Sequence, residues 1–176
     1  DSRKTFKLVS DLDGFNNERK DLENNLLNNL NSSISKNLCD CVIVLTGNNW
    51  HEGIIGIIAS KIKDKFNKPT IIISIDNNIG KASARSVVGF DIGKAIISAV
   101  QDKILIKGGG HKMAGGFTIN INQIDSFKSF INKKFQTINI DINNQKNLFI
   151  DSVISPSALN IDFYEKVDYL SPFGSG

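Results

Sequence analysis

The sequence predicts an α/β domain in which a mixed β-sheet is flanked by helices and preceded by a long helix. Three observations lead to this fold class. Continuous apolar runs at residues 41–47 and 70–75 have the length and composition of buried strands. Segments in which apolar residues recur at helical spacing alternate with the strands, most clearly within residues 48–69 and 124–135. A further helical pattern precedes all of them.

The first predicted helix covers residues 11–30. Asp11 can cap its start, and only Gly14 disfavours it. The other residues of this segment are mainly polar, so one narrow apolar stripe runs along the helix. Such a stripe indicates a helix that lies over another element or bridges to a further domain. The stripe consists of Leu12, Phe15, Leu22, Leu26 and Leu30.

The middle of the chain alternates between helices and strands. The helix within residues 48–69 is expected to run for about four turns and to end before Pro69. Residues 77–90 predict a turn, a strand and a loop. Asp91 is placed to cap a helix over residues 92–100.

The last third begins with a glycine-rich stretch that we expect to be a loop, followed by a strand at residues 115–121. The segment 124–135 predicts an amphipathic helix. Towards the end of the chain we expect a short strand and then a helix that begins at Ser155 and Pro156, a favourable cap and first-turn pair.

Composition sets mild limits on function. The 176 residues carry a net charge of +3, which permits a polyanionic partner without requiring one. No apolar run reaches membrane-spanning length, and no signal peptide opens the chain, so we expect no membrane partner. Cys39 and Cys41 are expected to be reduced thiols, which fits a cytoplasmic protein. The chain begins with Asp1 and ends at Gly176, and we expect it to be cut from a longer protein.

The glycine-rich stretch "GGGHKMAGG" is the first candidate for a binding site. Consecutive glycines let backbone N–H groups converge on an anion, and a histidine beside them adds a directed donor. Lys107 and Lys112 flank the stretch and add positive charge. The alternative is a tight turn with close helix–strand packing. The candidate residues are Gly108, Gly109, Gly110 and His111.

Two other segments support a phosphate site. Trp50 and His51 lie just before a predicted helix N-terminus, which attracts anions, although a core tryptophan and a satisfied histidine are the alternative. Ser83 and Arg85 are two residues apart in a predicted strand, so they share a face and can clamp a phosphate. A solvated basic strand end is the alternative there. Because each segment follows or ends a strand, we expect the loops to converge at one sheet edge.

These segments resemble the DHH-associated domain of RecJ-type single-stranded-DNA exonucleases, members of the DHH phosphoesterase superfamily. The resemblance rests on "NNWHEGIIGIIASKIKDKFNKP", "KASARS" and "GGGHKMAGGFTI", in this order. "LDGFNNERKDLE" resembles the start of the long helix that connects the catalytic DHH domain to the DHH-associated domain, and "LSPFGSG" resembles the beginning of the OB-fold domain that follows it. The resemblance therefore covers nearly the whole chain.

The resemblance implies three regions. Residues 1–36 would be the connecting helix, and residues 37–140 the DHH-associated substrate-binding domain. Residues 141–176 would be a linker and the start of an OB-fold domain, with the polar stretch 144–147 in the linker. In the family the Mn²⁺ or Mg²⁺ ions lie in the DHH domain. No D-H-H motif occurs here, so this chain is expected to bind no metal and to be inactive by itself.

The resemblance also implies a division of roles among the candidate residues. Ser83, Arg85 and His111 would contact the 5′-terminal phosphate or the nearby DNA backbone, with the amides of residues 108–110, whereas Trp50 and His51 match the family stretch without an assigned contact. Two features depart from the family pattern: "KASARS" has alanines where glycine is frequent, and lysine stands at position 112.

The full-length protein would then be a metal-dependent exonuclease that degrades single-stranded DNA from the 5′ end in DNA repair and recombination. Its expected partners are single-stranded DNA and, for the full-length enzyme, a single-stranded-DNA-binding protein or a helicase. Two alternatives remain: a DHH-type phosphodiesterase of short oligonucleotides or cyclic dinucleotides, and a nucleic-acid-binding or tRNA-editing accessory module.

Overall fold

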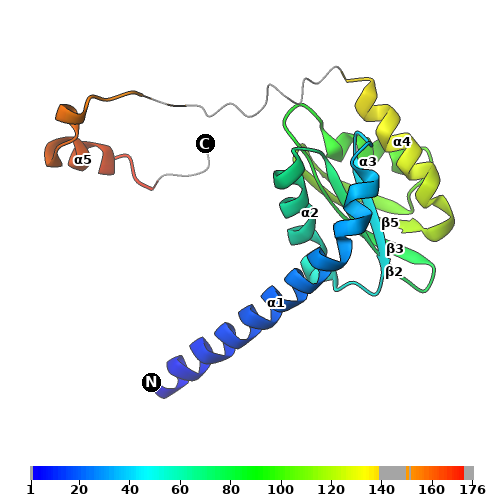
Figure 1. Cartoon of the computed structure of the whole chain (residues 1–176), viewed down its shortest axis with the longest axis horizontal. Helices are drawn as coiled ribbons and strands as arrows, with labels where there is room; N and C mark the ends of the chain where they lie inside the picture. Colours follow the sequence, from blue (N-terminus) through cyan, green and yellow to red (C-terminus); the bar gives the residue numbers. More distant parts are fainter. Residues whose placement is uncertain (1, 139–149, 151, 173–176) are drawn as a thin grey trace. The chain divides into compact units, whose positions relative to one another are not determined.

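The computed structural model describes residues 2–138, 150 and 152–172. The chain divides into two compact units, Asp1–Ile142 and Asn143–Gly176. The first unit contains the sheet and four of the helices, and the second contains short helical segments (Figure 1).

The first unit is built on one five-stranded sheet with the strand order β1-β2-β3-β5-β4. The pair β1 and β2 is parallel, and every other neighbouring pair is antiparallel. The sheet is therefore mixed, which confirms the predicted fold class. The strands are β1 (Ile43–Asn48), β2 (Thr70–Asp76), β3 (Ile79–Arg85), β4 (Lys107–His111) and β5 (Ala114–Asn120).

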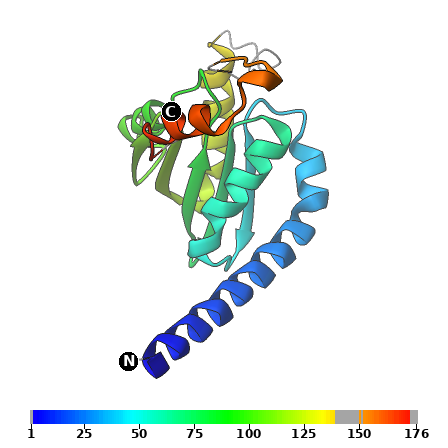
Figure 2. The same cartoon turned by 90° about the vertical axis from the view of Figure 1, so that its left-hand side faces the viewer.

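Helices cover both faces of this sheet. In Figure 2, α2 lies in front of the sheet and α4 behind it. The helices of the first unit are α1 (Ser2–Asn37), α2 (Glu52–Phe66), α3 (Ile92–Gln101) and α4 (Ile124–Gln136), with the short 3₁₀ turn η1 (Ile121–Gln123) before α4. Among the described residues, no helix combines the length and the apolar character that a membrane crossing needs.

Two apolar clusters fill the space between the sheet and its helices. Ile72 of β2 packs on the α2 side with residues of α1 and α2, whereas Ile71 and Ile73 pack on the opposite side with residues of α3 and α4. These three isoleucines are completely buried. Burial on both faces explains why the strand is a continuous apolar run rather than an alternating one.

The first helix is longer than predicted. It begins at Ser2 in the described part of the chain, so Asp11 lies inside it, and the prediction of a cap there is wrong. Apolar residues continue at helical spacing before Asp11, at Phe6 and Val9, and the helix continues with them. The predicted apolar stripe divides into two parts: Leu26 and Leu30 are buried, whereas Leu12, Phe15 and Leu22 are exposed.

The glycine stretch is a strand and not a loop, which corrects the prediction. Gly109 pairs with Gly116, and His111 pairs with Ala114, in an antiparallel hairpin between β4 and β5. Gly89 is the glycine with a positive φ in the described part of the chain, so the β4 glycines do not serve a left-handed turn. Close packing against β5 accounts for Gly108 and Gly110, because a Cβ on either would lie within 3 Å of an atom of that strand. The predicted cap at Asp91 is confirmed, because its carboxylate accepts from Lys94 N at 3.0 Å.

The second unit contains the 3₁₀ turn η3 (Pro156–Ala158) and the helix α5 (Ile161–Asp168). The α-helix predicted to begin at Ser155 therefore begins later, because Asn160 caps it by accepting from Phe163 N at 2.9 Å. Residues 152–155 form no strand, and the rest of the predicted strand lies outside the described residues apart from Ile150. The predicted polar linker at residues 144–147 also lies outside them. Both cysteines are free thiols, as predicted.

Candidate functional site

The candidate site lies on the face of β3, β5 and β4 that points to the α2 side. Ser83 belongs to this face because its cross-strand partner, Ile72, packs in the cluster beside α2. Alternate residues of a strand share a face, so the register defines three rows across the strands, about 7 Å apart. The rows are Lys81–Thr118–Lys107, Ser83–Gly116–Gly109 and Arg85–Ala114–His111.

A groove of about 580 Å³ lies between this face and the first turn of α2. The middle row has glycines at two of its three positions, Gly116 and Gly109, so bare backbone forms the open part of this face beside Ser83. A ligand can therefore approach the sheet backbone closely there. The groove is lined by Glu52, Ile55, Lys81, Ser83, Lys107 and Gly116, among others.

Ser83 and Arg85 form a preorganised pair of donors. Arg85 Nη1 donates to Ser83 Oγ at 3.0 Å and to the carbonyl oxygen of Ala84 at 2.9 Å. The serine hydroxyl accepts in this bond, so its own hydrogen is available to a ligand, as is Arg85 Nη2. Both side chains are half-buried. The prediction that they share a face is confirmed, and the geometry suits a phosphate oxygen.

The three glycines of β4 differ in what a side chain would meet. A Cβ on Gly108 would lie 2.6 Å from Phe117 Cβ, and a Cβ on Gly110 would lie 2.3 Å from the carbonyl oxygen of Ala114. A Cβ on Gly109 would have nothing within 4 Å. Close packing therefore accounts for the first and third glycines. The fold leaves the second unexplained, and it faces the same side as Ser83.

His111 stands in the same cross-strand row as Arg85. Its side chain is exposed, and its Nδ1 accepts from Met113 N at 3.3 Å. When Nδ1 accepts, the neutral ring carries its proton on Nε2, which leaves one donor for a ligand. Lys112 follows in the hairpin turn and is also exposed. His111 and Arg85 therefore lie at the same end of this sheet face, in the row next to the one that contains Ser83.

Trp50 and His51 lie at the other end of the sheet. His51 caps α2, because its Nδ1 accepts from Gly53 N at 3.1 Å. Trp50 is half-buried, and its indole packs so closely on Gly47 that a Cβ there would lie 2.0 Å from Cζ2. These contacts fit a packed tryptophan and a hydrogen-bonded histidine, the structural alternatives to a binding role. Binding by Trp50 and His51 therefore remains a prediction.

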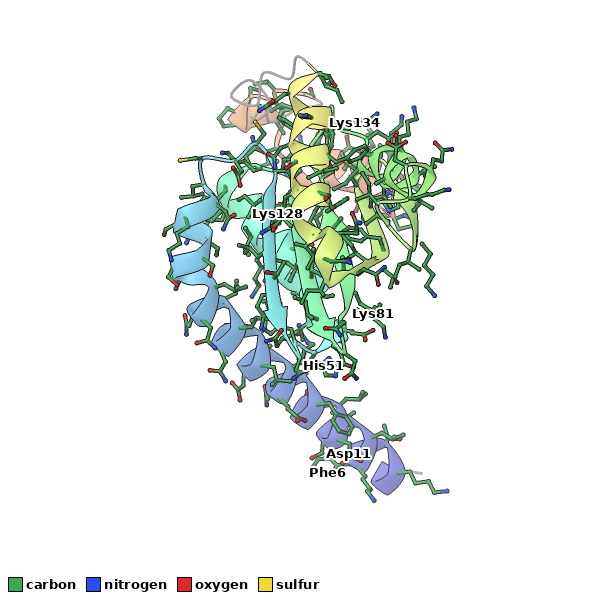
Figure 3. The ribbon with its side chains drawn as sticks, turned by 90° about the vertical axis from the view of Figure 1, so that its right-hand side faces the viewer. Phe6, Asp11, His51, Lys81, Lys128 and Lys134 are labelled. Atoms are coloured by element: carbon green, nitrogen blue, oxygen red, sulfur yellow. The ribbon has the colours of Figure 1, made fainter. Side chains whose placement is uncertain are left out.

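The segments do not converge at one sheet edge, which corrects the prediction. His51 follows the end of β1, whereas Arg85 pairs with Thr70 at the start of the neighbouring β2. The antiparallel direction of β3 is the reason, because it carries Arg85 to the edge opposite His51. Figure 3 shows His51 and Lys81 together at one end of the sheet. The candidate residues are spread along a face.

The sequence did not predict one ion pair that lines the groove. Lys81 Nζ lies 2.6 Å from Glu52 Oε1 of α2, and both residues line the groove. The hydrogen bond to Glu52, supported by the negative charge of that carboxylate, raises the pKa of Lys81. Lys81 could have been found from its spacing of two residues from Ser83. The approach of Glu52 depends on how α2 crosses β3, which no local pattern encodes.

The described residues contain no group of three or more His, Cys, Asp or Glu side chains placed to hold a metal ion. The donor set of the candidate site is instead serine, arginine, histidine, lysine and backbone amide. Such a set fits a phosphate or another oxyanion and does not fit a divalent metal centre.

The chain belongs to the DHHA1 domain family, whose model matches residues 40–137. Among curated proteins it is similar to the single-stranded-DNA-specific exonuclease RecJ of Bacillus subtilis, with 29% identity over 99% of this chain and 22% of that protein. It is also similar to RecJ of Haemophilus influenzae, with 28% identity over 98% of this chain and 32% of that protein. The chain thus spans between about a fifth and a third of these relatives.

Solved structures agree on the fold. RecJ of Thermus thermophilus in complex with Mn²⁺ superimposes with a TM-score of 0.79 at 24% identity, over 99% of this chain and 25% of that chain. A second structure, exonuclease RecJ bound to manganese, has a TM-score of 0.67 at 26% identity, over 81% of this chain and 36% of that chain.

Proposed function

We propose that this chain is the substrate-binding part of a single-stranded-DNA-specific exonuclease that works from the 5′ end. The observation that carries the proposal is the Ser83–Arg85 clamp, which shares one open sheet face with His111 and with the unexplained glycine at position 109. The relatives named as single-stranded-DNA-specific exonucleases support DNA as the ligand.

In this proposal the 5′ phosphate lies at the row of Arg85 and His111. Arg85 Nη2, the Ser83 hydroxyl and His111 Nε2 are the available donors. The strand β4 is at the edge of the sheet, so the amides of every second residue face away from β5. Because Gly109 and Gly116 form a hydrogen-bonded pair in this register, the outward amides are those of Gly108 and Gly110, and these can also donate.

The DNA backbone would continue over the glycine row towards Lys107 and Lys81. Lys107 is exposed and lines the groove, so its charge is available to a second phosphate. Trp50 and His51 lie beyond that end of the groove, where they would meet nucleotides further along the strand. Such a groove reads the DNA backbone and gives little sequence preference.

The regions outside the sheet fit a longer protein. We propose that residues 1–36 connect residues 37–140 to a catalytic DHH domain that holds Mn²⁺ or Mg²⁺, and that residues 141–176 lead into an OB-fold domain. Exposed apolar residues on the first half of α1, including Phe6 (labelled in Figure 3) and Phe15, offer a surface for such a domain. By the same resemblance, the full-length enzyme would act in DNA repair and recombination in the cytoplasm, alongside a single-stranded-DNA-binding protein or a helicase.

The test compares single-stranded oligothymidylates that carry a 5′ phosphate or a 5′ hydroxyl. We expect the chain to prefer the phosphate, and Arg85→Ala and His111→Ala each to weaken that binding by about ten- to a hundredfold. The double variant should lose less than the sum because both residues act on one ligand. Lys134→Ala removes an equal charge on α4, which covers the opposite face of the sheet from α2 (Figure 2), and should change affinity less than about twofold. The proposal would be rejected if the wild type bound the two oligonucleotides equally well and Arg85→Ala bound them as tightly as the wild type does.

A further inference from the structure

Gly56 of α2 lies directly against the phosphate clamp. A Cβ at this position would lie 2.9 Å from Arg85 Nη2 and 3.1 Å from Ser83 Oγ. Gly56 is half-buried. Its missing side chain thus leaves the space that the guanidinium and the hydroxyl occupy.

Packing of the helix on the apolar core does not account for this glycine. Four of the five buried positions of α2 carry isoleucine, and the fifth is Ala59, so none of them is glycine. The three nearest atoms to the missing Cβ all belong to Arg85 and Ser83. Glycine is also one of the poorest helix formers, so an interior position of a helix gains nothing from it unless a neighbour needs the space.

We propose that Gly56 is a positioning residue for Arg85. The recess that it leaves holds the guanidinium with Nη1 on Ser83 Oγ and Nη2 beside the helix backbone. This inference rests on the proposed function, because it assigns Gly56 to the same phosphate site. Arginine is long and flexible, so a methyl group at position 56 would displace the guanidinium and leave the helix in place. The fold then survives the substitution, whereas the clamp does not.

The experiment combines Gly56→Ala with Arg85→Ala in a double-mutant cycle. Gly56→Ala should weaken binding of the 5′-phosphorylated oligothymidylate about tenfold, and its melting temperature should stay equal or rise by about 2–4 °C. In the Arg85→Ala background the same substitution should change affinity less than about twofold. Gly14→Ala in α1 is the matched control, because a Cβ there has nothing within 4 Å, and it should leave affinity unchanged.

A crystal structure of the Gly56→Ala variant gives a readout that does not depend on DNA. We expect the bond between Arg85 Nη1 and Ser83 Oγ to be broken. Wild-type affinity in Gly56→Ala, an equal loss in the Arg85→Ala background, or a large drop in melting temperature would each overturn the inference. If Arg85→Ala itself keeps full preference for the 5′ phosphate, the proposed function fails, and the bond in the variant structure still decides whether Gly56 positions Arg85.

Discussion

At the scale of single residues, Gly108 and Gly109 are neighbours in one strand with opposite surroundings. A Cβ on Gly108 would meet Phe117 Cβ at 2.6 Å and Ile96 Cγ2 at 2.8 Å, whereas a Cβ on Gly109 would meet open space. Position 108 is therefore a packing site between β4, β5 and α3. Position 109 is free for a ligand that approaches the strand backbone.

This difference predicts opposite results for two alanine substitutions. Gly108→Ala should lower the free energy of unfolding by about 1–3 kcal/mol because it overpacks the core. Gly109→Ala should leave that free energy unchanged or raise it by up to about 1 kcal/mol, and it should weaken DNA binding because its methyl group fills the groove face. Urea denaturation and oligonucleotide binding measure the two effects. A Gly109→Ala protein with normal affinity would show that no ligand approaches there.

The sequence predicts some of these residues well and others not at all. The alternation of a strand places Ser83 and Arg85 on one face, and the pattern around Asp91 identifies a helix cap; both depend on near neighbours in the chain. The separate roles of Gly108 and Gly109 depend on Phe117 and on Ile96 of α3. These contacts come from different elements. The sequence "GGG" therefore predicts a site but does not show which glycine packs against the fold and which faces open space.

At the scale of elements, one buried carboxylate joins α1 to α2. Glu23 is 3% exposed, and it pairs with Arg19 of its own helix at 3.2 Å and with Lys61 of α2. Leu26 and Leu30 continue the contact as apolar packing. The pair with Lys61 fixes which face of α1 meets α2, because a rotation of the helix would leave the carboxylate buried without a partner.

Removal of this carboxylate should loosen the helix pair. Glu23→Ala should lower the free energy of unfolding by about 1–3 kcal/mol, less than for a fully buried pair because Arg19 and Lys61 are half-exposed and can turn to water. Glu18→Ala removes an exposed carboxylate from the same helix and should change it by less than about 0.5 kcal/mol. Chemical denaturation compares the two. Equal denaturation midpoints for Glu23→Ala and Glu18→Ala would mean that Glu23 does not stabilise the packing of α1 on α2.

The ion pair between Glu52 of α2 and Lys81 of β3 predicts a substitution that strengthens DNA binding. Glu52 forms an ion pair with Lys81, so its carboxylate neutralises the positive charge of one lysine that lines the groove. Glu52→Gln should return the pKa of Lys81 towards its ordinary value, still well above neutral pH, and free its charge for a phosphate. Affinity for single-stranded DNA should rise, and its salt dependence should steepen by about 0.7 in the logarithmic slope.

A control separates this local effect from net charge. Asp125→Asn raises the net charge by the same single unit, but Asp125 is an exposed residue of α4, the helix behind the sheet. If both variants bind DNA equally well, the effect belongs to overall charge and not to the groove.

The order of the strands could not be predicted at this scale. Each of the five strands except β4 was expected from its own pattern, whereas the register that aligns Arg85 with His111 through Ala114 depends on pairing between distant segments. The strand β4 was predicted as a loop because glycine is rare in strands and frequent in turns. The mixed sheet itself followed from the alternation of apolar runs and helical patterns.

At the scale of the whole molecule, the chain carries the proposed binding surface. Among the residues that the structure describes, no group of three or more His, Cys, Asp or Glu side chains is placed to hold a metal ion. A two-metal nuclease centre needs several carboxylate and histidine ligands close together. The chain has two histidines, and they lie at opposite edges of the sheet. The proposed function accordingly places substrate binding in this chain and bond cleavage in a further domain.

This assignment predicts that the purified chain binds single-stranded DNA without cutting it. In Mn²⁺ or Mg²⁺, no nucleotides should be released from a 5′-phosphorylated oligothymidylate beyond the rate without protein. Binding should be weak, because the net charge is only +3, and it should weaken further as salt rises. Arg85→Ala distinguishes a contaminating nuclease from activity of the chain. Release that persists unchanged in this variant comes from a contaminant, whereas release that falls with its DNA affinity would mean that the chain cleaves DNA itself and would overturn the division between binding and cleavage.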